Sequence, residues 1–340
     1  MLKFDTTVEY HGPKAEIATL TGSPLWGKSV GQVMDYLIGQ GFCHRSAERY
    51  LTPYGSGPEV HHFISSTGRD LLWIPSYGGI KGEDGLLRRA MEKVFWLLWQ
   101  ARVKVLIVGG TSGTADWRDS EEAVRPGDFV LPWSFRTSGN HRGLPGTPYE
   151  TSWPRYDLLL DDPFCPVLAK MVAEKVRADY CPQPFRQVHT PQEVRATLIV
   201  PDGITFETTY DILMWVVINR QISEKLQPKL PPVISLHGDC VNPVLARLLG
   251  IHVLYYHLPC NWAQGLHPEV GITETLYPLY EGAYPDAILE LEAWMLENLP
   301  VPTGKSCSCI RDLHISPEVF SKAMTQPLEN FAEAAAQPAE

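Results

Sequence analysis

The feature that most constrains the fold is an apolar run followed by a glycine-rich segment near the middle of the chain. Residues 103–108 (VKVLIV) are rich in β-branched side chains, which is typical of a strand buried in a parallel sheet. The run ends in Gly109-Gly110-Thr111-Ser112-Gly113-Thr114, which predicts a loop whose N–H groups can form an anion-binding nest. Open α/β sheets bind ligands at such strand ends. A tight strand–loop junction without a ligand is the alternative on these residues alone.

Composition and charge exclude several classes of function. The 340 residues are 44% hydrophobic and 20% charged, which is typical of a soluble globular protein. The formal net charge of −10 argues against a nucleic-acid partner. No apolar run reaches the roughly 20 residues of a membrane span, and MLKFDTTVEY lacks the apolar core of a signal peptide. We therefore expect a cytoplasmic protein.

The cysteines do not form a recognisable framework. The chain has seven cysteines, and only Cys307 and Cys309 are close together in the sequence. A C-x-C pair without partner ligands is weak evidence for a metal, so we expect reduced thiols, no metal site and no cofactor. The glycine-rich segment also lacks the G-x-G-x-x-G order of dinucleotide-binding proteins and the Gly-Lys-Ser/Thr of a P-loop.

The hydrophobic pattern predicts alternating strands and helices, which indicates an α/β protein. The expected strands are 15–20, 61–64, 71–74, 103–108, 196–200, 233–236 and 251–256, and the expected helices are 32–39, 86–101, 164–176, 211–224, 243–249 and 286–296. No repeat or linker divides them. We expect one domain over residues 1–300 and a polar, partly disordered C-terminal tail over 301–340.

Five stretches agree in order and spacing with a known family. They are residues 15–23, the glycine loop after Ile74-Pro75, 125–130 (RPGDFV), 202–208 (DGITFET) and 233–261. Over about residues 15–298 they resemble the purine nucleoside phosphorylase and methylthioadenosine phosphorylase family. The resemblance implies a single α/β domain with a mixed, barrel-like central sheet flanked by helices, and assembly as a homotrimer or a multiple of it. It also implies a glycosyltransferase that cleaves the N-glycosidic bond of a purine nucleoside with phosphate as nucleophile.

The resemblance assigns the purine ring to two of these stretches. Glu207 would hold the ring, and Asn261 falls where the purine-cleaving branch has an asparagine that hydrogen-bonds the base. The methylthioadenosine branch has an aspartate there and another two positions on, which here is Ala263. Glu207 with Asn261 therefore favours a 6-oxopurine-type edge or another ring with both a donor and an acceptor. The substrate-binding residues implied are Phe206, Thr208, Tyr77, Trp262, Gly238 and Cys260.

The phosphate-binding segments depart from the family. They read Thr21-Gly22-Ser23-Pro24, Tyr77-Gly78-Gly79-Ile80-Lys81, Gly109-Gly110-Thr111 and His237-Gly238-Asp239 in this chain. The family's arginine falls at Gly79. A phosphate dianion needs cations or several donors, and the point charge of Lys81 does not replace an arginine fork.

Three interpretations stay open. In the first, phosphate is the co-substrate and binds through Ser23, Lys81, Thr111 and the amides of Gly109 and Gly110. In the second, the site no longer uses phosphate, and Asp239 or His237 acts as a base on water or on another small ring compound. In the third, the protein only binds a small aromatic ligand. The candidate catalytic residues are Asn261, Glu207, Asp239 and His237, and the expected partner is a nucleoside or related heterocycle.

Overall fold

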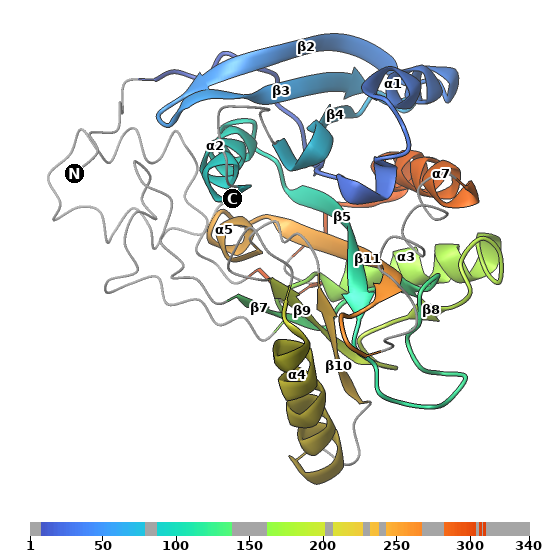
Figure 1. The fold of residues 1–340 in the computed structure, drawn as a ribbon. Coiled ribbons are helices and arrows are strands. Elements are labelled where there is room, and N and C mark those ends of the chain that lie inside the picture. Colours follow the sequence, from blue (N-terminus) through green and yellow to red (C-terminus); the bar gives the residue numbers. More distant parts are fainter. Residues whose placement is uncertain are drawn as a thin grey trace, which may run out of the picture.

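The computed structural model describes residues 8–78, 87–137, 162–200, 207–226, 232–237, 243–266, 282–303, 306–307 and 309–310. At its centre lies a mixed sheet of 11 strands (Figure 1). The strands are β1 (Ile17–Thr19), β2 (Cys43–Thr52), β3 (Gly55–Ile64), β4 (Asp70–Trp73), β5 (Val105–Thr114), β6 (Phe129–Val130), β7 (Ser134–Thr137), β8 (Val188–His189), β9 (Arg195–Val200), β10 (Val233–His237) and β11 (His252–Trp262).

The order of the strands makes β5 the centre of the sheet. The main path runs β2-β3-β4-β1-β5-β10-β9-β7, and β11 joins β5 as a branch that continues to β6 and β8. Strands β1, β4, β5 and β11 are parallel, whereas β10 runs antiparallel to β5. The expected mixed α/β architecture is confirmed. Among the described strands, however, the pairings form a branched open path, not a closed barrel.

Helices cover both faces of this sheet (Figure 1). They are α1 (Val30–Gly39), α2 (Leu87–Gln100), α3 (Pro166–Asp179), α4 (Thr209–Gln221), α5 (Pro243–Leu248) and α7 (Ala283–Asn298). Leu106 and Val108 of β5 share a buried cluster with α2 and α5, while Val105 and Ile107 share another with α1, α3 and α7. Successive side chains of a strand point to opposite faces, so β5 contributes to both cores. None of the described helices combines the length and apolarity needed to cross a bilayer.

The helix predictions are confirmed, but four strands were missed: β2, β6, β7 and β8. β2 is an edge strand whose residues are mostly exposed, so it lacks the alternation of apolar and polar residues that identifies a half-buried strand. β7 lies at the other end of the main path and falls in the segment 133–153, which the sequence suggests is a loop. The strands β2 and β7 were missed for the same reason: at an edge, backbone pairing defines the strand and side-chain burial leaves little trace in the sequence. The strands β6 and β8 have two residues each, which is too short for a periodic pattern.

The expected loop at 109–114 is wrong, and the strand expected at 251–256 continues to Trp262, so both segments are the ends of long strands. β5 and β11 remain paired from Val105↔His252 to Thr114↔Trp262. A Cβ atom on Gly109 would lie 2.2 Å from Tyr256 Oη, and one on Gly110 would lie 2.7 Å from the ring of His257. Glycine is therefore required for space next to β11. Because strand N–H groups point alternately to either side, the basis for an anion-binding nest there is removed.

A buried carboxyl group joins α7 to this part of the sheet. Tyr256 Oη donates to Glu292 Oε1 at 2.8 Å, and Thr19 Oγ1 donates to Glu292 Oε2 at 3.3 Å. Glu292 is only 3% exposed. Burial raises the pKa of Glu292 to about 8, and the two hydrogen bonds offset part of this shift. The side chain is therefore mostly uncharged at neutral pH.

The raised pKa of Glu292 predicts a pH-dependent stability. The carboxyl has its ordinary pKa of 4.5 in the unfolded chain and about 8 in the folded one. Between these values the folded state holds one more proton, so the free energy of unfolding falls as pH rises, by up to about 1.4 kcal/mol per pH unit. Urea denaturation at about pH 5 and about pH 8 should show that Glu292→Gln removes this slope. The matched control Glu174→Gln, at an exposed position of α3, should retain it. Parallel pH profiles for the wild type and Glu292→Gln would contradict the assignment.

Candidate functional site

Four of the predicted ligand-binding residues form one hydrogen-bonded cluster where parallel strands end. Ser23 follows β1, Tyr77 follows β4, and Gly109 and Thr111 belong to β5. Tyr77 Oη accepts from the Ser23 N–H at 3.1 Å and donates to the Gly109 carbonyl at 2.8 Å. Ser23 Oγ lies 3.0 Å from Tyr77 Oη and accepts from the Thr111 N–H at 3.0 Å. The cluster therefore ties the segments after β1 and β4 to the central strand.

This cluster occupies donors that a bound phosphate would need. The N–H groups of Ser23 and Thr111 both donate to oxygen atoms within it. The Tyr77 ring also fills the space over Gly22, where a Cβ would lie 2.1 Å from the ring. An anion at this position must displace Tyr77 or use other donors. Lys81, the predicted cation, lies outside the described residues.

The backbone that presents Tyr77 is strained. Ser76 and Tyr77 have left-handed conformations (φ 50° and 57°), and Gly78 follows at φ 74°. The left-handed helical region costs a non-glycine residue roughly 1–2 kcal/mol, so two in succession require compensation from the surroundings. The hydrogen bonds of Tyr77 and its packing on Gly22 supply that compensation. Strain of this kind is concentrated at ligand sites and switches.

A β-bulge orients Asn261 at the end of β11. Pro259 pairs with Ser112 and Asn261 pairs with Gly113, so Cys260 is an extra residue. The Cys260 thiol contacts the Asn261 Oδ1 at 3.3 Å, and Asn261 Nδ2 donates to the Trp262 carbonyl at 2.7 Å. The amide nitrogen has two N–H donors and the amide oxygen has two lone pairs, and each of these contacts uses one of them. The Asn261 side chain can therefore donate one further hydrogen bond and accept one further hydrogen bond.

Gly113 lies between two of the predicted catalytic positions. It pairs with His237 of β10 on one side and with Asn261 of β11 on the other. Two strand spacings separate His237 from Asn261, which places their Cα atoms about 10 Å apart. A Cβ on Gly113 would lie 3.1 Å from Asn261 Nδ2, so glycine leaves room for the amide. The structure describes the backbone of His237 but not its side chain.

The start of α4 lies against the end of β11. Gly265 packs on Thr209, the first residue of α4, where an added Cβ would lie 2.3 Å from Thr209 Cγ2. Ala263 shares a buried cluster with Ile212 of the same helix. Glu207 is 9% exposed and precedes Thr209 by two residues. The structure therefore brings the segments that carry Glu207 and Asn261 together, as a shared ring-binding site requires. That both side chains hold a ring stays a prediction.

Thr208 is the N-cap residue of α4. Its side chain is exposed and caps α4: the hydroxyl accepts from the Asp211 N–H at 3.2 Å and lies 2.7 Å from Asp211 Oδ2. Such a capping box satisfies backbone donors at the helix start. Among the other predicted site residues, Phe206, Gly238 and Asp239 lie outside the described residues.

His257 is a buried histidine that packs on Gly110, between Gly109 and Thr111 of the hydrogen-bonded cluster. It is 0% exposed, and neither ring nitrogen has a hydrogen-bond partner among the described residues. Its ring stacks on Tyr255 with centroids 5.0 Å apart. Burial lowers the pKa of His257 to about 3, so the ring is neutral at physiological pH. It acts as an aromatic core residue against Gly110.

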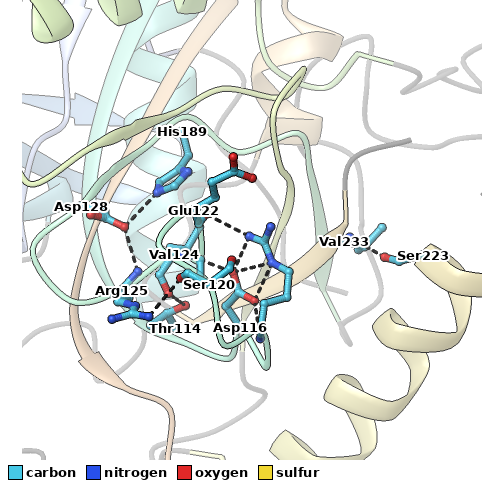
Figure 2. A network of polar contacts seen from close by, with 12 residues as sticks. Thr114, Asp116, Ser120, Glu122, Val124, Arg125, Asp128, His189, Ser223 and Val233 are labelled. Carbon is cyan, nitrogen blue, oxygen red and sulfur yellow. Dashed lines mark hydrogen bonds and ion pairs between the residues drawn. The ribbon is translucent and has the colours of Figure 1, made fainter. Parts of the chain in front are cut away.

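Two buried aspartates order the segment after β5 (Figure 2). Asp128 Oδ2 accepts from the Arg125 N–H at 2.8 Å and from Arg186 at 2.6 Å, and it lies 2.9 Å from His189 Nε2. Asp116 accepts from the Val124 N–H at 2.8 Å. The 125–130 motif thus has a structural role: its aspartate closes a turn and ties it to β8. It supports the site without entering it.

Neither a protein-family model nor a curated protein sequence matches the chain. Solved structures do match. A mutant of adenosine/methylthioadenosine phosphorylase from Schistosoma mansoni in complex with adenine aligns with a TM-score of 0.60 and 14% identity, over 87% of this chain and 99% of that one. Isoform 2 of purine nucleoside phosphorylase from the same organism, in complex with cytosine and ribose-1-phosphate, aligns with a TM-score of 0.58 and 14% identity, over 85% and 92%.

A third structure, Schistosoma mansoni purine nucleoside phosphorylase in complex with adenosine, gives a TM-score of 0.53 and 17% identity over 84% of this chain and 91% of that one. Identities this low establish architecture but not activity. The similarity spans most of both chains in each case. The chain therefore has the fold of the purine nucleoside phosphorylases and methylthioadenosine phosphorylases.

Proposed function

We propose that the protein cleaves the N-glycosidic bond of a purine-type nucleoside, as an enzyme of the nucleoside phosphorylase type. One observation carries the proposal: Asn261 and the backbone of His237 flank Gly113 at the end of the central strand, and Thr209, two residues after Glu207, packs on Gly265 just beyond β11. Solved structures with this fold contain adenosine, hypoxanthine or ribose-1-phosphate. The purine rings of adenosine and hypoxanthine present N–H donors and ring-nitrogen acceptors, which an amide and a carboxylate can recognise.

The bond breaks when the leaving purine takes up negative charge while the sugar becomes oxocarbenium-like. The Asn261 amide can donate a hydrogen bond to a ring nitrogen and accept one from a ring N–H. Glu207 adds a carboxylate that can accept from another N–H of the same ring. Hydrogen bonds that strengthen as charge develops lower the barrier, whereas equally strong ground-state bonds do not.

We expect Asn261→Ala and Glu207→Ala each to lower kcat/KM for purine release by about 100-fold, because each removes a contact to the departing base. Chromatographic quantification of hypoxanthine, guanine and adenine from their nucleosides is the measurement. The matched controls Asn298→Ala and Glu174→Ala change exposed residues of α7 and α3 and should retain wild-type activity. Wild-type rates in both site variants, with wild-type melting temperatures, would refute the assignment.

A second candidate, cleavage by water, is favoured by the position of Tyr77. Its hydroxyl takes the Ser23 N–H and the Gly109 carbonyl, which leaves the predicted phosphate site short of donors. A hydrolase requires a base for water, and Asp239 or His237 is the candidate by chain position. The two reactions differ in their sugar product, which is ribose-1-phosphate with phosphate and free ribose with water.

Purine release measured across a phosphate series separates the two reactions. With water as the nucleophile, we expect a shallow phosphate dependence in the wild type. Tyr77→Phe should lower the phosphate KM approximately tenfold, since the variant releases the Ser23 N–H for an anion. Tyr77→Phe should also lower the free energy of unfolding by about 1–3 kcal/mol. A steep phosphate dependence in the wild type, with ribose-1-phosphate as the product, would exclude the water reaction.

We also propose the homotrimer that the family resemblance implies, and α4 offers a surface for such self-association. This helix extends away from the rest of the molecule (Figure 1) and exposes large apolar side chains along one face: Tyr210, Leu213, Met214, Val217 and Ile218. Ile212 and Trp215 on another face of the helix are buried, so α4 is apolar on two sides. An exposed apolar face of this kind fits a contact with another protein chain. Because α4 begins beside Glu207, a second copy of the chain on this face would adjoin the proposed site.

Light scattering during size exclusion should give three times the chain mass of 38.1 kDa. The double variant Leu213→Glu/Val217→Glu should shift the mass towards one chain, because burying two carboxylates at the contact is costly. A wild-type protein that elutes with the mass of one chain at all concentrations would contradict the trimer.

A further inference from the structure

Four buried side chains from three distant parts of the chain meet at the start of β11. Cys165 is the N-cap residue of α3, His252 is the first residue of β11, and Cys307 and Cys309 follow α7. One ligand atom of each lies within 4.8 Å of the corresponding atoms of the other three. Their exposed fractions are 1%, 6%, 5% and 1% in that order.

The separations suit a shared ion better than a covalent bond. The Sγ atoms of Cys165 and Cys307 are 3.5 Å apart, and those of Cys307 and Cys309 are 3.1 Å apart. His252 Nδ1 lies 3.1 Å from Cys309 Sγ. A disulfide needs about 2.05 Å. Zn–S bonds of about 2.3 Å at tetrahedral angles hold two sulfurs about 3.8 Å apart. Seating an ion would thus move these atoms by only several tenths of an ångström.

The surroundings also fit an anionic metal centre. Zinc with three thiolates and a neutral imidazole has a net charge of −1. The Arg247 side chain is buried and interacts electrostatically with Cys165, Cys307 and Cys309. Its guanidinium also donates to the Asp162 carbonyl, which fixes its orientation. A buried cation beside the cysteines offsets that charge.

We propose that Cys165, His252, Cys307 and Cys309 bind a structural zinc ion in a Cys3His site. Thiolate and imidazole ligands select zinc over magnesium or calcium, and four protein ligands leave no open position for catalysis. Binding releases three thiol protons and converts the energy of ligation into folding energy. The ion links the C-terminal segment to α3 and β11. His252 and Asn261 are nine residues apart on β11, so the zinc lies about 30 Å from the proposed active site.

Metal analysis of the purified full-length chain tests the proposal directly. We expect about one zinc ion per chain. Replacement by Co²⁺ should give thiolate-to-cobalt charge-transfer bands and the visible bands of a tetrahedral ion. Cys307→Ser and His252→Gln should lose the zinc. The control Cys43→Ser changes an exposed cysteine of β2 and should retain it.

A measurement on the wild-type chain keeps the test decisive if these variants fail to fold. A strong chelator should lower the melting temperature, and added Zn²⁺, but not Mg²⁺, should restore it. The proposal is wrong if the reduced protein binds no zinc after incubation with Zn²⁺. It is also wrong if mass spectrometry finds a disulfide among these cysteines in the purified protein, or if the metal found there is iron or copper.

Discussion

The pairing of β5 with β11 is the constraint on which the rest of the structure depends. The two strands stay in register for nearly their whole lengths, and side chains of β11 cross the backbone of β5. Tyr256 and His257 come too close to β5 for a Cβ atom on the glycine they face, and Asn261 would leave a tight contact of 3.1 Å. The glycines of β5 are therefore conditions of strand packing, and the same packing aligns the candidate residues at the carboxyl ends.

β11 also carries residues of three separate polar sites, each with a different role. At its first residue, His252 belongs to the cysteine cluster. In its middle, Tyr256 binds the buried carboxyl of Glu292 and ties α7 to the sheet. At its far end, a bulge orients Asn261 towards the proposed purine site. One long strand can thus transmit stability from the C-terminal segment to the residues that would contact substrate.

Tyr77 gives the proposed active site its particular character. A phenol held by a strained backbone accepts from the Ser23 N–H, a donor that an anion would otherwise contact. The hydrogen bonds within the cluster satisfy Ser23 and Gly109 without any ligand, so the site is ordered before substrate arrives. Because these donors are already in use, the arrangement disfavours a dianion at the Tyr77 end of the proposed site.

Sequence periodicity alone determined the helices and the strands of the inner sheet, because burial of one face leaves a repeating apolar pattern. The roles expected of Asn261 and Glu207 came from the family resemblance, and the C-x-C pair was visible in the sequence without its partner ligands. Only the tertiary structure decided that residues 109–114 form a strand, since glycine is favoured equally by loops and by close packing of strands. Cys165 and His252 joined Cys307 and Cys309 only in three dimensions, because sequence spacing carries no information on contacts up to 142 residues apart. Likewise, Tyr77 became a competitor for the anion-binding donors only when β1, β4 and β5 were placed side by side.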